Sequence, residues 1–187
     1  MRTQRDRVID LLRYSVSEAR FAHCRRVAAC CRTISKHYAL NSSACEFVGW
    51  AHDLAREWSP HSLLDFAARV DPKGMDPVET EEPTLLHGHV ASIIVARDLG
   101  VSDSCLLEAI RYHTLGKREF CSFGKVLYCA DYLEPARPNV PDELRCAVGA
   151  VTLDELVRLV ITDTRRRGYA ISERTEAMYQ SVEKGSR

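Results

Sequence analysis

Imidazole and carboxylate side chains recur along this chain at positions where a helical pattern would bury them. Six of them lie inside apolar periodic segments rather than in polar loops: His23, His52, Asp53, His87, His113 and Asp131. A buried ionisable group must be paired or bound to a metal, so several helices that point such groups inward favour a shared centre. His52 and Asp53 are adjacent, and adjacent helical positions point about 100° apart. They can converge only on a small object beside the helix, and a metal ion fits that description.

The ligand types restrict both the metal and the chemistry. Imidazole nitrogen and carboxylate oxygen suit iron, manganese or cobalt. The eight cysteines include no CxxC pair, so we expect free buried thiols rather than a structural zinc site or disulfides. Two ions roughly 3.5 to 4 Å apart can bridge a water, lower its pKa towards about 7 and hold both ends of an in-line displacement at phosphorus. The residues therefore favour metal-assisted hydrolysis at phosphorus.

Several cationic side chains lie close in sequence to these ligands and could neutralise phosphate oxygens. They are Arg56, Lys117, Arg118 and Arg137. For Lys117 and Arg118 a solvated turn is an equally good interpretation. His89 points to another side of its helix than His87 and is expected to line the pocket rather than to bind metal. Taken singly, His23 or His113 would more often be a hydrogen-bonded core histidine, and it is the whole set that favours ligands.

The elements that must position these residues are helices. Apolar residues recur with helical spacing along almost the whole chain, and no strand alternation, repeat or internal domain boundary is evident. Ser17, Ser59-Pro60 and Gly100 supply caps, and Ser43 with Glu46 forms a capping box. We therefore predict an all-α helical bundle whose helices cover residues 8–12, 17–34, 43–55, 60–67, 85–99, 102–113, 123–133, 152–168 and 172–179.

One long loop interrupts this pattern. Residues 71–83 contain three prolines, a glycine and several acidic side chains. Such a segment is read either as a mobile lid beside the site or as a solvated connector, and the pattern does not separate the two.

Composition sets the outer bounds. The chain has 187 residues, 45% hydrophobic and 28% charged, which predicts a single domain, 1–187, with the motif-bearing core at about 18–140 and C-terminal helices 141–184 packed on it. The formal net charge is zero, so no global field draws the protein to nucleic acid or to an anionic membrane. No signal-peptide or membrane-length apolar run is present, which predicts a cytoplasmic location.

The order of the candidate ligands resembles that of the HD-domain metal-dependent phosphohydrolases, and specifically the YqeK-like symmetrical bis(5'-nucleosyl)-tetraphosphatases. The resemblance covers roughly residues 18–140. It is carried by five blocks: His23-x-x-x-Val27, Ala51-His52-Asp53, His87-Gly88-His89, His113-Thr114-x-Gly116 and Ala130-Asp131-x-x-Glu134-Pro135-x-Arg137. The last two blocks are the more specific to the family. The resemblance implies that His23, His52, Asp53 and Asp131 hold one metal, and that His87 and His113, with Asp53 bridging, hold a second.

The same resemblance implies the activity. It predicts a hydrolase that cleaves diadenosine tetraphosphate symmetrically to two ADP, using a hydroxide that bridges two transition-metal ions, iron or else manganese or cobalt. The expected catalytic residues are Asp53, Arg56 and Arg137, and the expected substrate-binding residues are His89, Lys117, Arg118 and Arg137. Related proteins often have lysine where this chain has Arg56, which puts that catalytic role in question. A homodimer is one option for its assembly.

Two other readings stay open. One is an HD-type mononucleotide phosphohydrolase or pyrophosphohydrolase, and the other is a non-catalytic module that senses a nucleotide. Retention of all six candidate ligands argues against the second, because a purely structural bundle would gain by replacing them with apolar residues. For the nucleoside ends of a substrate, the candidate aromatic walls are Tyr112, Phe120, Phe123 and Tyr132.

Overall fold

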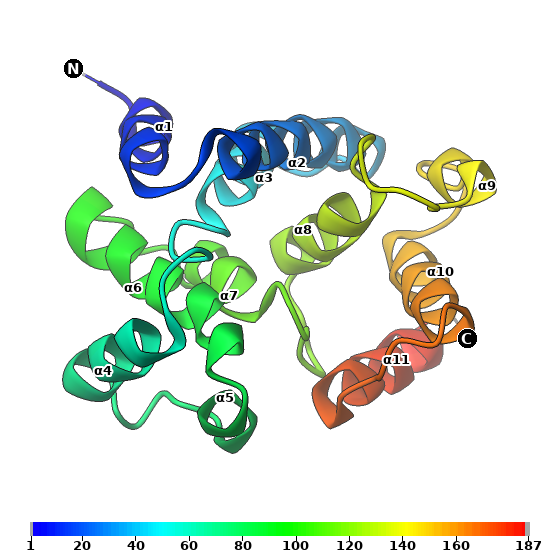
Figure 1. Ribbon diagram of the computed structural model, residues 1–187. Coiled ribbons are helices and arrows are strands. Elements are labelled where there is room, and N and C mark those ends of the chain that lie inside the picture. Colours follow the sequence, from blue (N-terminus) through cyan, green and yellow to red (C-terminus); the bar gives the residue numbers. More distant parts are fainter. Residues whose placement is uncertain (1, 186–187) are drawn as a thin grey trace.

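The computed structural model describes residues 2–185, and within that range every regular element is a helix (Figure 1). The predicted all-α fold is confirmed. The elements in chain order are α1 (Gln4–Ser15), α2 (Glu18–His37), α3 (Ser42–Ala51), α4 (Pro60–Val70), α5 (Pro77–Glu81), the 3-10 helix η1 (Pro83–Leu86), α6 (His87–Leu99), α7 (Ser104–Tyr112), α8 (Ser122–Leu133), α9 (Asp142–Cys146), α10 (Leu153–Arg166) and α11 (Glu173–Gly185).

Helix α3 forms the centre of the molecule, because its residues from Cys45 to Ala51 are all buried. It packs along α2, and α8 packs against both helices; α6 and α7 lie on one side of this core, and α10 packs on α8 from the other side (Figure 1). The contact between α2 and α3 is close at Gly49, where an added Cβ would lie 2.6 Å from Cα of Ala28. A glycine at this position lets the two backbones approach, which brings the C-terminal end of α3 beside the first half of α2.

The local signals at the helix ends are mostly confirmed. Ser17 caps α2, Ser59 caps α4 with Pro60 at its first position, and Gly100 ends α6 with φ of 69°. The predicted start of α3 and the predicted long loop are wrong. The residue that caps α3 is Asn41, whose side chain accepts from two backbone amides, so the helix starts before the proposed Ser43 box. The segment 71–83 is not a continuous loop, since α5 forms within it behind an Asp76 capping box.

No helix within residues 2–185 combines the length and the apolar character needed to cross a membrane.

A buried carboxylate joins the first three helices. Glu46 on α3 is 7% exposed and lies 2.8 Å from Arg5 Nη2 of α1 and 2.8 Å from Arg32 Nη1 of α2. Burial acts to raise the pKa of Glu46, but hydrogen bonds from Arg5 and Arg32 outweigh it and hold the pKa below its ordinary value. The charged form therefore stabilises the fold.

Replacing Glu46 with glutamine is expected to lower the free energy of unfolding at pH 7 by about 1–2 kcal/mol, because two guanidinium groups lose their partner. Since the folded pKa lies below the unfolded one, this contribution is present above pH about 4.5 and is lost as the pH falls through the folded value. Wild type and variant should therefore converge on acidification. Urea unfolding at several pH values measures this, with Glu119→Gln on the exposed turn before α8 as control. A difference independent of pH would contradict the assignment.

Candidate metal centre

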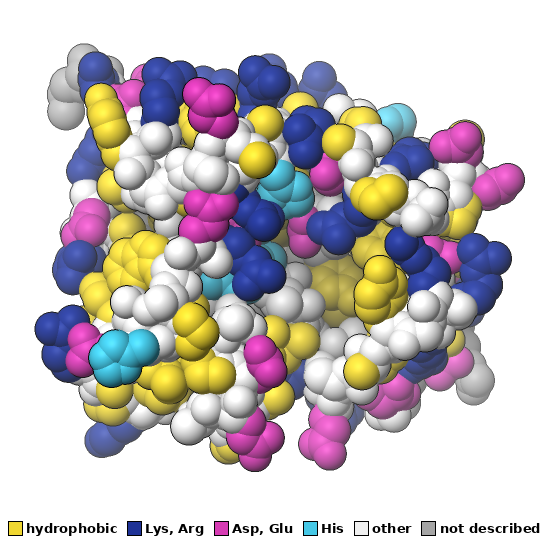
Figure 2. Space-filling view, in the orientation of Figure 1, with side chains coloured by type: hydrophobic (Ala, Val, Ile, Leu, Met, Phe, Trp, Pro, Cys, Tyr) yellow, Lys and Arg dark blue, Asp and Glu magenta, His cyan; other side chains and the backbone are white. Residues whose placement is uncertain are grey.

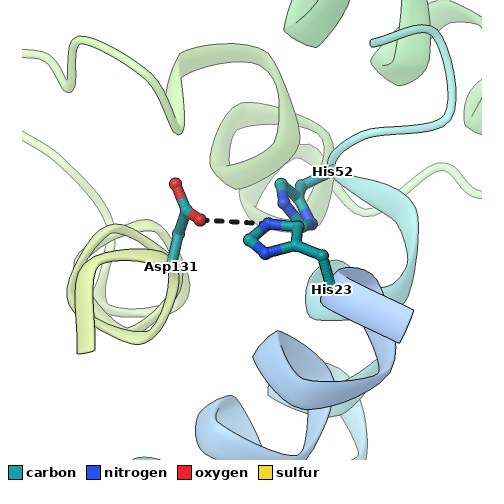
Figure 3. Close-up of side chains that lie close together, drawn as sticks. All are labelled: His23, His52 and Asp131. Atoms are coloured by element: carbon teal, nitrogen blue, oxygen red, sulfur yellow. Dashed lines mark ion pairs between the residues drawn. The ribbon is translucent and has the colours of Figure 1, made fainter. Parts of the chain in front are cut away.

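Five segments of the chain bring the six predicted ligands together. His23 comes from α2, His52 and Asp53 follow α3, His87 starts α6, His113 caps the end of α7 and Asp131 lies in α8. Their ligand atoms form two groups, His23 with His52 and Asp131, and Asp53 with His87 and His113, and within each group the atoms lie within 4.8 Å of one another. Figure 3 shows the first group, in which three side chains from three elements point toward one another.

Asp53 lies between the two groups. Its Oδ2 is 3.3 Å from Nε2 of His52 and 3.7 Å from Nε2 of His23. Its Oδ1 is 3.3 Å from Nε2 of His87 and 3.7 Å from Nε2 of His113. Each carboxylate oxygen therefore faces one pair of histidines, which is the arrangement that a carboxylate bridging two ions requires.

The position of Asp53 depends on where α3 ends. The sequence predicted helix through Ala55, but the helix ends at Ala51 and the chain continues in turns over 52–57. Backbone bonds from Leu54 to Ala51 (3.2 Å) and from Arg56 to Asp53 (3.0 Å) are of the tighter i to i+3 type. This tightening changes the direction of the side chains after Ala51, so that His52 and Asp53 both reach the centre.

Backbone carbonyls fix the orientation of three of the imidazoles. Nδ1 of His52, His87 and His113 lies 2.8, 2.6 and 2.9 Å from the carbonyl oxygen of the residue three positions earlier. A carbonyl can only accept, so Nδ1–H donates, and in the neutral ring this leaves the Nε2 lone pair pointing into the centre. Nδ1 of His23 instead lies 3.4 Å from Oε1 of Glu134. All four rings therefore present Nε2 to the same space.

The electrostatics suit ligands for a cation. Burial lowers the pKa of His113 to about 3, with His87 and His52 adding to the effect, so this ring is neutral at physiological pH. Burial acts to raise the pKa of Asp53, but His52 and His87 hold it well below its ordinary value. Burial opposes ionisation of Asp131 in the same way, and the hydrogen bond with His23 keeps its pKa low. Charged carboxylates and a neutral imidazole are the protonation states that bind metal.

Unsatisfied atoms show that the residues fit a metal. Nε2 of His52 is fully buried and has no hydrogen-bond partner among the residues described. Nε2 of His87 lies 3.1 Å from Nε2 of His113, and two lone pairs cannot bond to each other without a proton or cation between them. The Cys24 thiol is also within reach of His52 and Asp53, but burial raises its pKa well above its ordinary value and keeps it protonated. The nitrogen and oxygen atoms are therefore the candidate donors.

Arginines surround the cavity of about 290 Å³ above these ligands. Arg20 Nη1 lies 2.9 Å from Asp53 Oδ2, and Arg137 Nη2 lies 2.8 Å from Asp131 Oδ1. Arg56 also lines the cavity, is exposed, and forms no ion pair within the described part of the chain. Figure 2 shows Lys and Arg side chains gathered around recessed His side chains near the middle of one face. Sequence reasoning missed Arg20, although its position three residues before His23 places both on one face of α2.

Three predicted substrate-binding residues lie away from this cavity. Nε2 of His89 is 3.1 Å from Asp71 Oδ2, and His89 lines a different cavity, of about 450 Å³, together with Lys117. Lys117 Nζ pairs with Glu108 Oε2 at 2.8 Å. Arg118 is exposed on the turn before α8 and is not among the residues that line the metal cavity. The structure does not bring these three side chains to the ligands.

A second hollow, of about 260 Å³, adjoins the metal cavity. The two share His113, Thr114, Asp131 and Arg137, and the second is completed by Tyr128, Tyr132, Thr164 and Tyr169. Of the four predicted aromatic walls, only Tyr132 lines this hollow. Tyr112 lines the cavity of His89, Phe120 is buried against Gly124, and Phe123 is half-buried and lines neither the metal cavity nor this hollow. Tyr128, Thr164 and Tyr169 were missed.

Glu134 was also missed as a site residue. It is buried, its Oε2 accepts from Arg26 Nε at 2.7 Å and from the Ala136 amide at 2.8 Å, and its Oε1 faces His23. One carboxylate thus holds a ligand ring and the backbone that follows α8. The spacing of three from Asp131 was the available signal.

Comparison with known proteins shows which family the chain resembles. The HD domain family model matches residues 20–136. A protein of Bacillus subtilis (strain 168) named symmetrical bis(5'-nucleosyl)-tetraphosphatase is 31% identical over 75% of this chain and 75% of its own length. A protein of the same name from Staphylococcus aureus is 28% identical over 88% of this chain and 79% of its own length.

A bifunctional relative and a solved structure extend this similarity. A Mycoplasma genitalium protein named probable nicotinate-nucleotide adenylyltransferase/Ap4A hydrolase is 26% identical over 85% of this chain, which spans 43% of that protein. The crystal structure of a predicted HD superfamily hydrolase involved in NAD metabolism from Clostridium acetobutylicum superimposes with a TM-score of 0.85. That structure is 23% identical and the match covers 96% of this chain and 97% of that one, which shows a common fold. Because the family model matches more than half of the chain and the relatives are named as hydrolases, the chain belongs to the HD domain family and is a hydrolase.

Proposed function

We propose that this hydrolase cleaves dinucleoside tetraphosphates symmetrically, so that diadenosine tetraphosphate gives two ADP. The observation that carries the proposal is the two-part ligand cluster joined by Asp53 at the base of an arginine-lined cavity. The names of the curated relatives support the choice of substrate. Two ions are proposed, iron first, with manganese or cobalt as alternatives, because imidazole and carboxylate donors suit all three.

The candidate ligands form two groups, and each group would hold one ion. His23, His52 and Asp131 would hold one ion, His87 and His113 would hold the other, and Asp53 would bridge them. Two ions held by these residues would lower the pKa of a shared water and neutralise phosphate oxygens. The hydroxyl of exposed Thr114 lies 3.3 Å from Nε2 of His113 and 3.5 Å from Nε2 of His87, where it can hydrogen-bond to a water or phosphate oxygen beside them.

The arginines have separate tasks. Arg20 and Arg137 each pair with a ligand carboxylate, which orients those carboxylates and leaves the remaining guanidinium N–H groups for phosphate. Arg56 has no such partner among the described residues, so its whole guanidinium is available for bidentate contact with a phosphate. A chain of four phosphates carries more negative charge than a mononucleotide, and a cavity lined by three arginines suits it.

Product analysis tests the proposal. Metal-reconstituted protein is incubated with diadenosine tetraphosphate, and an early time point is separated by chromatography. We expect ADP as the single nucleotide product, because attack at the second phosphorus from one adenosine makes both halves ADP. In oxygen-18 water, one of every two ADP molecules should carry one label.

The alternatives give other products. ATP with AMP would show asymmetric cleavage, and turnover of mononucleotides alone would make the protein a mononucleotide phosphohydrolase. Tight binding without turnover in all three metals would leave a nucleotide-sensing module. Each of these results would contradict the proposed reaction without contradicting the proposed metal centre.

A further inference from the structure

The hollow beside the metal cavity is built from two parts of the chain. Its inner wall comes from the turn after α7 and from α8, within the HD-matched range. Arg137, Thr164 and Tyr169 lie beyond residue 136, with Thr164 on α10 and Tyr169 just after it. The hollow's volume of about 260 Å³ is separate from that of the metal cavity, but the two share four residues. A ligand bound at the metal centre therefore has direct access to the hollow.

The helix cap after α10 places Tyr169 at the rim. The Gly168 amide donates to Arg165 O at 2.9 Å, and the Tyr169 amide donates to Thr164 O at 3.3 Å. This pair of bonds, with Gly168 at φ of 80°, is a Schellman motif, and the left-handed residue turns the chain back over the end of the helix. Tyr169 is nevertheless 58% exposed, so its ring is positioned by backbone structure without being part of the core.

The walls offer ring faces more than hydrogen-bond donors. The Tyr132 hydroxyl donates to Asp163 Oδ2 at 2.7 Å and accepts from Arg167 Nη1 at 3.1 Å, and Thr164 Oγ1 donates to Val160 O at 2.9 Å. The Tyr128 hydroxyl makes no hydrogen bond to any residue that the structure describes. Arg167 Cζ lies 5.4 Å from the centroid of the Tyr169 ring, which keeps that ring beside a cation.

We propose that this hollow is a nucleoside subsite, in which a purine base stacks on Tyr169 while its phosphates pass Arg137 into the metal cavity. The inference rests on the proposed function, because it places one end of a dinucleoside polyphosphate. Every base has a π-face, so binding by stacking tolerates different bases. The Tyr132 and Thr164 donors are already engaged, and the Tyr128 hydroxyl can either donate or accept, so the subsite should accept guanine as well as adenine. The segment after the HD-matched range thus supplies the nucleoside end of the site.

Binding measurements separate the base from the phosphates. Metal-loaded wild type, Tyr169→Ala and Tyr169→Phe are titrated with ADP and with inorganic tripolyphosphate by calorimetry. Loss of the ring should weaken ADP binding by about tenfold, since one stacked base is worth roughly 5-fold to 100-fold in affinity. Tripolyphosphate binding should stay unchanged, phenylalanine should restore ADP binding, and GDP should bind wild type within about threefold of ADP. Tyr14→Ala is the matched control, because Tyr14 is 89% exposed on α1 and does not line the hollow.

The outcomes are distinct. ADP binding that is unchanged in Tyr169→Ala, or tripolyphosphate binding that falls equally, would overturn the subsite. Failure of wild type to bind ADP while it binds tripolyphosphate would do the same. Weaker ADP binding in Tyr169→Ala supports the subsite even if diadenosine tetraphosphate is not hydrolysed, in which case only the proposed reaction fails.

Discussion

Asp53→Ala is expected to empty both halves of the metal centre and to lower kcat by at least about 1,000-fold, which corresponds to several kcal/mol of lost charge stabilisation. The reason is geometric. Oδ1 of Asp53 faces His87 and His113, while Oδ2 faces His23 and His52, so one substitution removes a ligand from each group. His87→Ala removes a ligand from one group only, and it should lose about half of the metal. Elemental analysis and initial rates measure both effects.

A control is available on the same helix. His89 lies two residues after His87 and is also buried, but its ring faces Asp71 rather than the cluster. His89→Gln should therefore keep the full metal content. Complete and equal retention of metal in Asp53→Ala and His87→Ala would rule out a bridging role for Asp53.

The clustering of the six candidate ligands could be predicted from the sequence because each one interrupts an apolar period. Asp131 stands among Val126, Leu127 and Ala130 on a helix that would otherwise bury only apolar groups, and His113 follows Ile110 on the same face. Such patterns report which residues must be buried, and burial of ionisable groups requires a common partner. The ends of several helices could also be predicted, because capping residues such as Ser17 and Gly100 act locally.

The geometry of the centre could not be predicted in the same way. The end of α3 at Ala51 depends on turns that the apolar pattern does not reveal, and these turns orient Asp53. The approach of α2 to α3 depends on Gly49, a glycine within a helix that has no periodic signature. The first feature is a local turn without an apolar signature, and the second arises from packing between segments that are distant in sequence.

Closeness in sequence to the ligands correctly placed Arg56 and Arg137 at the cavity, but it failed for Lys117 and Arg118. Lys117 follows His113 by four positions, but the turn at Gly116, with φ of 68°, carries it to the cavity of His89, where Glu108 pairs with it. Arg20 is 33 positions from Asp53 and yet bonds to it, because α2 and α3 pack side by side. A turn reverses direction within a few residues, so sequence neighbours on either side of it can face different cavities.

Removing the metal should lower the melting temperature by about 10 °C. A ligand present at 100 to 1,000 times its Kd stabilises the folded state by roughly 3–4 kcal/mol. For a chain of this size, each kcal/mol shifts the melting temperature by about 2–4 °C. Without a cation, the buried Nε2 of His52 has no hydrogen-bond partner among the described residues, and in their neutral Nδ1–H forms His87 and His113 turn two lone pairs toward each other at 3.1 Å. The free-energy cost of these unpaired buried nitrogen atoms destabilises the folded state and not the unfolded chain.

The helices should survive the treatment. The packing of α2, α3 and α8 rests on apolar side chains such as Val27, Val48 and Leu127, which do not touch a metal, so far-ultraviolet circular dichroism at 20 °C should be unchanged by chelator while the thermal midpoint falls. Asp53→Ala gives the matched control, since a variant that binds neither ion has no metal-dependent stability to lose and its midpoint should be the same with and without chelator. A wild-type midpoint that chelator does not move would mean that these six side chains satisfy one another without an ion. The cluster would then be a structural network, and both the metal centre and the hydrolytic chemistry assigned to it would be wrong.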